Sequence, residues 1–144
     1  DGDHFEAFDM IVDEYDVETY VPTEAIAETA NAPDHRVSDG DTIGSFTAVY
    51  TPGHGDDHYS YIETDTGSAI MGDAVSGADQ RGLPTGNFHL PPAVYSTDLN
   101  QAEESLDRLL EYSFDSALVF HGSSVLENAD SKLDRYVNFP GKPT

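Results

Sequence analysis

The apolar residues of this 144-residue chain fall in short segments separated by glycine, proline and aspartate, and this pattern restricts the fold most. Short apolar segments between turn signals are typical of strands, whereas apolar residues at helical spacing indicate helices. We therefore expect an α/β fold in a single domain, residues 1–144. Strands are expected at residues 18–22, 42–43, 46–51, 59–63, 68–71 and 117–120, and helices at residues 5–15, 98–112 and 126–137.

Further expectations concern the segments between these elements. Thr23 is expected to cap a short alanine-rich helix, and the strands up to residue 51 are expected to form a meander. Residues 74–97 contain glycines and prolines without periodicity, so we expect a long loop with a functional role. Asp98, with Gln101 three residues later, resembles a capping box that opens the helix after this loop.

The charge of the chain excludes several classes of partner. There are 28 Asp and Glu residues against 6 Lys and Arg, which gives a formal net charge of −22. Nucleic acid and anionic membranes are poor partners, because binding their phosphates requires a basic surface. An acidic surface of this kind repels itself in dilute buffer and is screened at high salt, which indicates a cytoplasmic protein of an extreme halophile.

The residue types available for metal binding are limited. The chain has no cysteine, so any metal must be held by histidine and carboxylate. His4, His54, Asp73 and His121 each stand where a predicted strand or helix meets a loop, and such side chains can meet at one edge of a sheet. Their nitrogen and oxygen atoms suit Zn²⁺ or another borderline divalent ion. A lone histidine is more often a hydrogen-bonded structural residue, so the prediction depends on the whole set.

Four short motifs in this order resemble the metallo-β-lactamase superfamily. They are DH at residues 3–4, TPGH at 51–54, GD at 72–73 and HG at 121–122. His58, four residues after His54, matches the second histidine of the glyoxalase II-like form, and we interpret it as a supporting residue. The resemblance implies the αββα sandwich of the family, of which this sequence would be the C-terminal portion together with the first motif helix. The strands that precede the first motif in the family are not in this sequence.

The resemblance also implies a set of metal ligands. They are Asp1, Asp3, His4, His54, Asp73 and His121. Asp73 would bridge two ions, and Asp3 would in addition act as the catalytic residue that orients water. Asp1 stands where imidazole is usual in the family, so it is either a ligand or a solvated terminal acid. The implied cofactor is one or two Zn²⁺ ions, with Mn²⁺ or Fe²⁺ as alternatives.

The function implied by the resemblance is that of a metal-dependent hydrolase. A metal-bound hydroxide would attack a small ester, thioester, amide or phosphoester. One alternative is a non-catalytic binding or assembly module whose first metal site is degenerate, and another is a redox protein with a non-haem iron site. The expected partner is a small-molecule substrate, and assembly into a homo-oligomer is left open.

Overall fold

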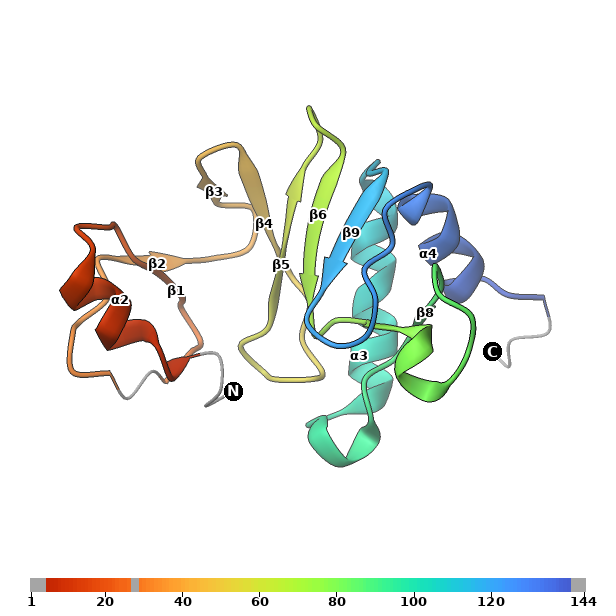
Figure 1. The fold of residues 1–144 in the computed structure, drawn as a ribbon, viewed down its shortest axis with the longest axis horizontal. Helices are drawn as coiled ribbons and strands as arrows, with labels where there is room; N and C mark the ends of the chain where they lie inside the picture. The colour runs from red at the N-terminus through yellow and green to blue at the C-terminus, as the bar shows by residue number, and fades with distance from the viewer. Residues whose placement is uncertain (1–4, 27–28, 141–144) are drawn as a thin grey trace.

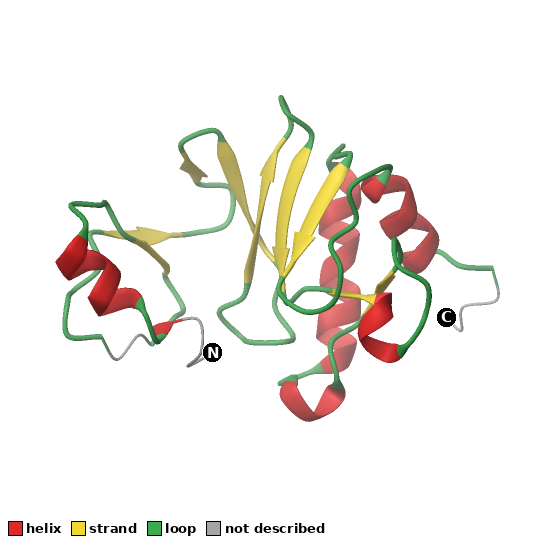
Figure 2. Cartoon of the chain, viewed as in Figure 1, coloured by secondary structure: helices red, strands yellow, loops and turns green. Residues whose placement is uncertain are grey.

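The computed structural model describes residues 5–26 and 29–140, and it shows a mixed α/β fold, as expected (Figures 1 and 2). The α-helices are α2 (Phe8–Glu14), α3 (Leu99–Ser105) and α4 (Ala129–Val137). The 3₁₀ helices are η1 (Ala78–Arg81), η2 (Ala93–Tyr95) and η3 (Leu106–Glu111). The strands are β1 (Tyr20–Pro22), β2 (His35–Val37), β3 (Thr42–Ile43), β4 (Phe46–Tyr50), β5 (Tyr59–Glu63), β6 (Ser68–Gly72), β7 (Ser76–Gly77), β8 (Phe88–His89) and β9 (Ser116–Val119).

The centre of the fold is a five-stranded sheet with the strand order β3-β4-β5-β6-β9. Neighbouring strands are antiparallel except β6 and β9, which are parallel. Because β4 and β6 are both antiparallel to β5, the strands β4, β6 and β9 run in the same direction. Their C-terminal ends therefore lie at the same edge of the sheet, and the residues that follow them are brought together there.

One face of the sheet packs against α3, η3 and α4. Side chains alternate between the two faces of a strand, so Ala69 and Met71 of β6 face the helices while Ile70 faces the other way. Full burial of a leucine stabilises a fold by about 1.5–3 kcal/mol, and three leucines of η3 and α4 are fully buried here. The main residues of this core are Val49, Ile62, Ala69, Met71, Leu106, Leu109, Phe114, Ala117, Leu133 and Val137.

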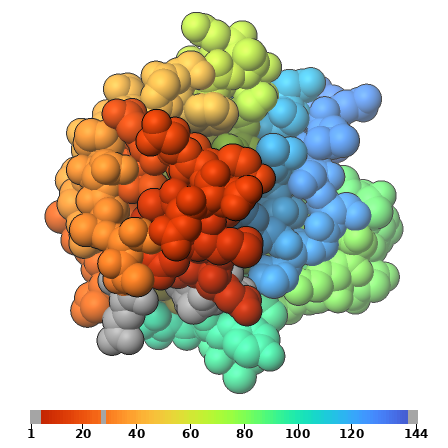
Figure 3. All heavy atoms as spheres, turned by 60° about the vertical axis from the view of Figure 1, so that its left-hand side comes forward, coloured from red at the N-terminus to blue at the C-terminus, as the bar shows by residue number. Residues whose placement is uncertain are grey.

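The opposite face of the sheet is only partly covered. A smaller cluster joins Val37, Ala48 and Tyr59, whereas Leu118 and Phe120 near β9 are 44% and 55% exposed. The N-terminal elements α2, β1 and β2 lie beyond the β3–β4 end of the sheet in Figure 1, and Figure 3 turns them toward the viewer.

Two expectations for the N-terminal third are wrong. The sequence predicted a helix from Thr23, but residues 23–26 contain a turn and no helix. The Thr23 amide and hydroxyl both donate to the carbonyl of Val37, at 2.9 and 3.0 Å, and so tie this turn to β2. The predicted meander is also wrong, because β1 and β2 pair in parallel as a separate two-stranded sheet.

The segment expected to be one long loop, residues 74–97, is partly regular. It contains β7 and β8, which pair antiparallel, and the 3₁₀ helices η1 and η2. Two-residue strands and single turns have no detectable periodicity, so the sequence pattern missed them.

The C-terminal helices agree more closely with the sequence. Oδ1 of Asp98 accepts hydrogen bonds from the amides of Asn100 and Gln101, at 2.9 and 3.1 Å, which confirms the predicted N-cap. The second half of the predicted capping box differs, because the Asp98 amide donates to the carbonyl of Gly53 at 2.9 Å. The predicted helix 98–112 is α3 followed by the 3₁₀ helix η3, and the last helix begins at Ala129 rather than at residue 126. Within residues 5–26 and 29–140, no helix is both long and apolar enough to cross a membrane.

Candidate metal centre

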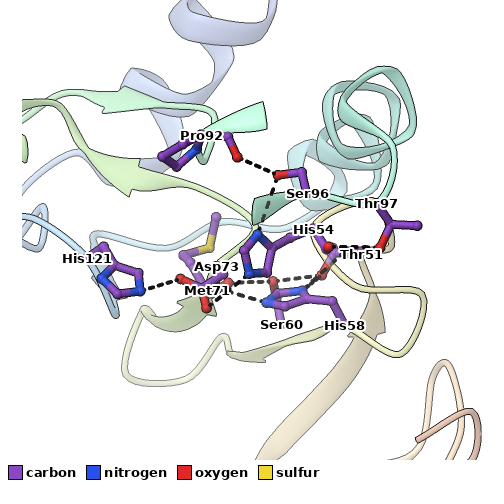
Figure 4. A network of polar contacts seen from close by, with 10 residues as sticks. All are labelled: Thr51, His54, His58, Ser60, Met71, Asp73, Pro92, Ser96, Thr97 and His121. Atoms are coloured by element: carbon purple, nitrogen blue, oxygen red, sulfur yellow. Dashed lines mark hydrogen bonds and ion pairs between the residues drawn. The ribbon is translucent and has the colours of Figure 1, made fainter. Parts of the chain in front are cut away.

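Three predicted ligands meet at the edge of the sheet where β4, β6 and β9 end. His54 lies in the turn after β4, Asp73 directly follows β6, and His121 lies two residues after β9. Figure 4 shows the two imidazoles on either side of the Asp73 carboxylate. Nε2 of His54 lies 3.7 Å from Oδ2 of Asp73, and Nε2 of His121 lies 3.5 Å from Oδ1. Each carboxylate oxygen therefore faces a different histidine.

The Asp73 carboxylate is buried, whereas the site remains open on the His121 side. Asp73 is 1% exposed and His54 is 8% exposed, but the side chain of His121 is 51% exposed. A carboxylate removed from water requires compensation by a cation or by hydrogen bonds. The two imidazole distances are longer than a normal N–H···O hydrogen bond of about 2.7–3.2 Å. The spacing therefore resembles that of ligands around an ion more than that of a hydrogen-bonded pair.

The position of His54 depends on the turn before it and on the start of α3. Gly53 has φ +129, and a Cβ atom there would lie 2.1 Å from the amide nitrogen of Ala102 in α3. Only glycine permits this approach. The carbonyl of Gly53 accepts a hydrogen bond from the amide of Asp98 at 2.9 Å, and the carbonyl of His54 accepts one from Thr97 at 3.0 Å. The N-terminus of α3 thus fixes the backbone of His54.

A side chain that the sequence did not single out lies next to the second ring nitrogen of His54. Oγ of Ser96 lies 3.5 Å from Nδ1 of His54 and donates a hydrogen bond to the carbonyl of Pro92 at 3.1 Å. Nδ1 of His54 thus faces Ser96, while Nε2 faces Asp73. Serine is common in loops and Ser96 is 42 residues away along the chain, so no sequence signal marked it.

His58 supports Asp73 from the start of β5, in the supporting role that the sequence favoured. Nε2 of His58 accepts a hydrogen bond from the amide of Asp73 at 2.9 Å, so this nitrogen carries no proton. Nδ1 is therefore the protonated nitrogen, and it lies 2.9 Å from Oγ1 and 3.2 Å from the carbonyl oxygen of Thr51. A Cβ on Gly72 (φ +56) would lie 2.8 Å from Nε2 of His58, so glycine is required before Asp73.

The donor set fits divalent ions in part. Two ligands of one tetrahedral ion, each about 2.0–2.2 Å from it, lie about 3.3–3.6 Å apart, close to the His–Asp distances observed here. However, among residues 5–26 and 29–140 no group of three or more His, Asp or Glu side chains is arranged to hold one ion. Both observations agree with a carboxylate that contributes one oxygen to each of two ion positions, with a single described histidine at each.

The remaining ligands predicted from the sequence are Asp1, Asp3 and His4, and they lie outside the described residues. Their positions relative to Asp73 stay predictions, as does the catalytic role of Asp3. The described part of the chain therefore brings together three of the six predicted ligands, which are His54, Asp73 and His121.

A cavity of about 200 Å³ opens beside His54. It lies on the sheet face away from α3 and α4, and its wall is largely aromatic. None of the described residues that line it is Lys or Arg. The lining includes Phe5, Asp57, Tyr59, Tyr61, Ile70 and Phe120.

Solved structures with the same arrangement of elements identify the fold. The BLEG-1 B3 metallo-beta-lactamase matches 94% of this chain with a TM-score of 0.68 and 18% identity. The protein TTHA1623, solved in a di-iron-bound form, matches 93% with a TM-score of 0.67 and 17% identity. The chain has the metallo-β-lactamase fold. These structures confirm the superfamily resemblance at the level of the fold. No protein-family model matches the sequence.

The chain spans different shares of the metallo-β-lactamase-fold proteins that it matches. It spans 72% of both BLEG-1 and TTHA1623. It spans 35% of a metallo-beta-lactamase family protein from Thermus thermophilus, which matches 74% of this chain with a TM-score of 0.52 and 22% identity. The larger part of that Thermus protein has no counterpart in this chain.

Proposed function

We propose that this protein is a metal-dependent hydrolase that acts on a small ester, thioester, amide or phosphoester. The observation that carries the proposal is the buried Asp73 carboxylate, whose two oxygens each face the Nε2 atom of a different histidine. The two His–Asp distances, 3.7 and 3.5 Å, are close to the separation of about 3.3–3.6 Å between two ligands of one tetrahedral ion, so they suit an ion on each side of the carboxylate. The di-iron form of a protein with the same fold supports a site for two ions.

The proposed ligands divide between the two oxygens of Asp73. His54 and Oδ2 of Asp73 would hold one ion, together with Asp1. His121 and Oδ1 of Asp73 would hold the other, together with Asp3 and His4. When bound, divalent ions here lower the pKa of coordinated water toward ~7 and polarise the carbonyl or phosphoryl oxygen of a substrate. Nitrogen and oxygen ligands favour Zn²⁺, and the carboxylates make Mn²⁺ or Fe²⁺ the alternatives.

The residues around the ligands would hold the site ready for substrate. The amide of Asp73 donates to His58, which holds the backbone of this proposed ligand in place, and Ser96 lies beside Nδ1 of His54. Asp3 would orient the attacking water and accept its proton. The neighbouring aromatic cavity is large enough for a small substrate group.

The charge of the protein supports the proposed partner and location. With a net charge of −22, a nucleic-acid substrate is disfavoured by repulsion from its phosphates, and a small molecule is the proposed substrate. The same charge supports a cytoplasmic protein adapted to high salt.

One observation favours a second candidate, a non-catalytic module that uses the metallo-β-lactamase fold for binding or assembly. Asp1 is a carboxylate at a position where the family usually has imidazole, so the first predicted metal site has one imidazole fewer than is usual. A site that lacks imidazole at the position of Asp1 would then hold a single structural ion or none.

Hydrolysis by the metal-loaded protein separates the two candidates. We expect Zn²⁺- or Mn²⁺-loaded protein to hydrolyse p-nitrophenyl acetate, a thioester or bis(p-nitrophenyl) phosphate, and chelation to abolish the rate. Asp73→Asn should reduce metal content and rate together, whereas Asp34→Asn, which changes an acid distant from the site, should change neither. Wild-type protein with bound metal and no rate above buffer with any of these substrates would favour the non-catalytic module.

A further inference from the structure

The loop that carries His121 is held by the segment of residues 77–79. Oδ1 of Asp79 accepts a hydrogen bond from the amide of Ser123 at 2.7 Å, and Oδ2 accepts one from the Ser123 hydroxyl, also at 2.7 Å. The amide of Gly77 donates to the carbonyl of His121 at 2.8 Å. Residues 77–79 therefore hold the backbone on both sides of Gly122, at His121 and at Ser123. These hydrogen bonds from Ser123 also hold the pKa of Asp79 below its usual value, so Asp79 is a carboxylate at neutral pH.

The backbones of the two segments touch, which makes this contact specific. A Cβ on Gly122 (φ +77) would lie 2.6 Å from the carbonyl oxygen of Gly77, and a Cβ on Gly77 would lie 2.4 Å from that of Ser123. Both positions thus require glycine. Hydrogen bonds across so close a contact fix the two segments relative to each other.

His121 is the most exposed of the three predicted ligands in the described residues. Its side chain is 51% exposed, compared with 8% for His54 and 1% for Asp73. Its loop is also closed by the pairing of Ala117 with Val125 and by the Ser124 hydroxyl, which accepts from the Val119 amide at 3.2 Å. The last paired residue of β9 is Val119, and beyond it the amide of Phe120 bonds to the carbonyl of Gly72 at 3.2 Å. Few packing contacts therefore hold the imidazole over Asp73, and the backbone of its loop must do so.

We propose that Asp79 is a positioning residue that clamps Ser123 and thereby holds the His121 imidazole over the Asp73 carboxylate, ready to bind a metal ion. The metal-binding part of this proposal rests on the function proposed above. The geometric part, the placement of His121 over Asp73, concerns the protein's own residues and can be measured without metal.

Three variants and one control separate a clamp from a general effect on stability. Asp79→Ala removes both hydrogen bonds to Ser123. Asp79→Asn keeps an oxygen that accepts from the Ser123 amide, and its side-chain nitrogen can donate to the Ser123 hydroxyl. This variant should therefore keep both hydrogen bonds without the charge. Ser123→Ala removes the hydroxyl bond alone and should give a smaller effect. Asp34→Ala is the matched control, because Oδ2 of Asp34 accepts the amide and the hydroxyl of Thr19 at 2.9 and 2.8 Å, away from the site.

The first measurement uses the metal-free protein. We expect nuclear Overhauser contacts between the His121 ring and the Asp73 methylene protons in the wild type, Asp79→Asn and Asp34→Ala. They should be lost in Asp79→Ala and weakened in Ser123→Ala, while circular dichroism reports intact secondary structure. Retention of these contacts in Asp79→Ala overturns the proposal, and so does their loss in Asp79→Asn. If Asp79→Ala does not fold, Ser123→Ala decides, and unchanged contacts in it overturn the clamp.

The second measurement is the affinity for Zn²⁺, obtained by competition with a chelator. Removing a side chain that orients a ligand typically weakens metal binding about 10–100-fold, so this loss is expected for Asp79→Ala, with near wild-type affinity for Asp79→Asn and Asp34→Ala. Wild-type affinity in Asp79→Ala, with hydrolysis intact, overturns the clamp and leaves the proposed function standing. A different result would overturn the proposed function but support the role of Asp79. In that case the wild type binds no Zn²⁺, and Asp79→Ala loses the Overhauser contacts between His121 and Asp73.

Discussion

Replacing His58 by alanine is expected to weaken the fold at the candidate site. His58 connects two strand ends, because its Nε2 accepts the amide hydrogen of Asp73 at 2.9 Å and its Nδ1 lies 2.9 Å from Oγ1 of Thr51. Both partners are 1% exposed. Alanine removes the acceptor for the Asp73 amide without making room for an equivalent protein group.

The size of the effect follows from these two contacts. A buried donor left without its acceptor costs about 1–3 kcal/mol, and a lost hydrogen bond to a hydroxyl adds about 0.5–1.5 kcal/mol. We therefore expect His58→Ala to lower the free energy of unfolding by about 2–4 kcal/mol. A domain of this size typically has about 5–15 kcal/mol in total, so the variant should still fold. His58→Gln places an amide oxygen near the position of Nε2, and it should recover about half of the loss because it restores one of the two contacts.

Urea unfolding followed by circular dichroism measures this difference. The wild type, His58→Ala and His58→Gln should share one slope against urea and differ in midpoint. Thr97→Ala is a useful control, because it removes a 3.2 Å bond to the carbonyl of His54 without orphaning the Asp73 amide. A His58→Ala protein within about 0.5 kcal/mol of the wild type would show that the Asp73 amide does not depend on His58, since a buried amide left without its acceptor costs more than that.

Three further predictions concern other parts of the molecule. The melting temperature should rise between 0.1 and 2 M KCl, because screening within a few Å relieves the repulsion of a −22 charge; a falling melting temperature would contradict this. Burial, and then the hydrogen bond to Glu24, raise the pKa of Tyr59. In the unfolded chain the Tyr59 hydroxyl ionises near pH 10, below its pKa in the folded protein. The free energy of unfolding in urea should therefore stay constant below about pH 10 and fall above it, and the fall should be less steep in Tyr59→Phe. The Ser76 hydroxyl is buried without a hydrogen-bond partner among the described residues, so Ser76→Ala should be neutral or stabilising by up to about 1 kcal/mol; a clear loss in urea unfolding would show that the hydroxyl is paired.

The elements that could be predicted from the sequence are those with strong periodicity or a strong local signal. Asp98 was identified as an N-cap because a side-chain acceptor directly precedes the apolar pattern of α3. The strands β4, β5 and β6 were found because aspartate and glycine turns separate their apolar segments. The shared direction of β4, β6 and β9 also explains why His54, Asp73 and His121, far apart in the sequence, meet at one edge.

The features that the sequence missed depend on contacts between distant segments. The strand β2 has three residues and pairs in parallel with β1, so neither its length nor a hairpin turn marks it. Thr23 has the residue type of a helix cap, but its hydroxyl bonds to Val37 instead, because tertiary pairing outweighs a weak local preference.

The residues that support the candidate ligands were hidden for the same reason. Ser96 lies 42 residues from His54, and Asp79 lies 44 residues from Ser123. Serine and aspartate are frequent in loops, and an acidic chain offers many of them. Only the fold distinguishes these two from the rest.

Anomalous diffraction from crystals of the Zn²⁺-loaded protein would locate the proposed ions. We expect zinc peaks on either side of the Asp73 carboxylate, within about 2.0–2.2 Å of one of its oxygens and of Nε2 of His54 or His121. Both peaks should disappear in Asp73→Asn crystals. A fully occupied zinc bound elsewhere, with His54 and His121 still facing an ion-free Asp73, would contradict this expectation.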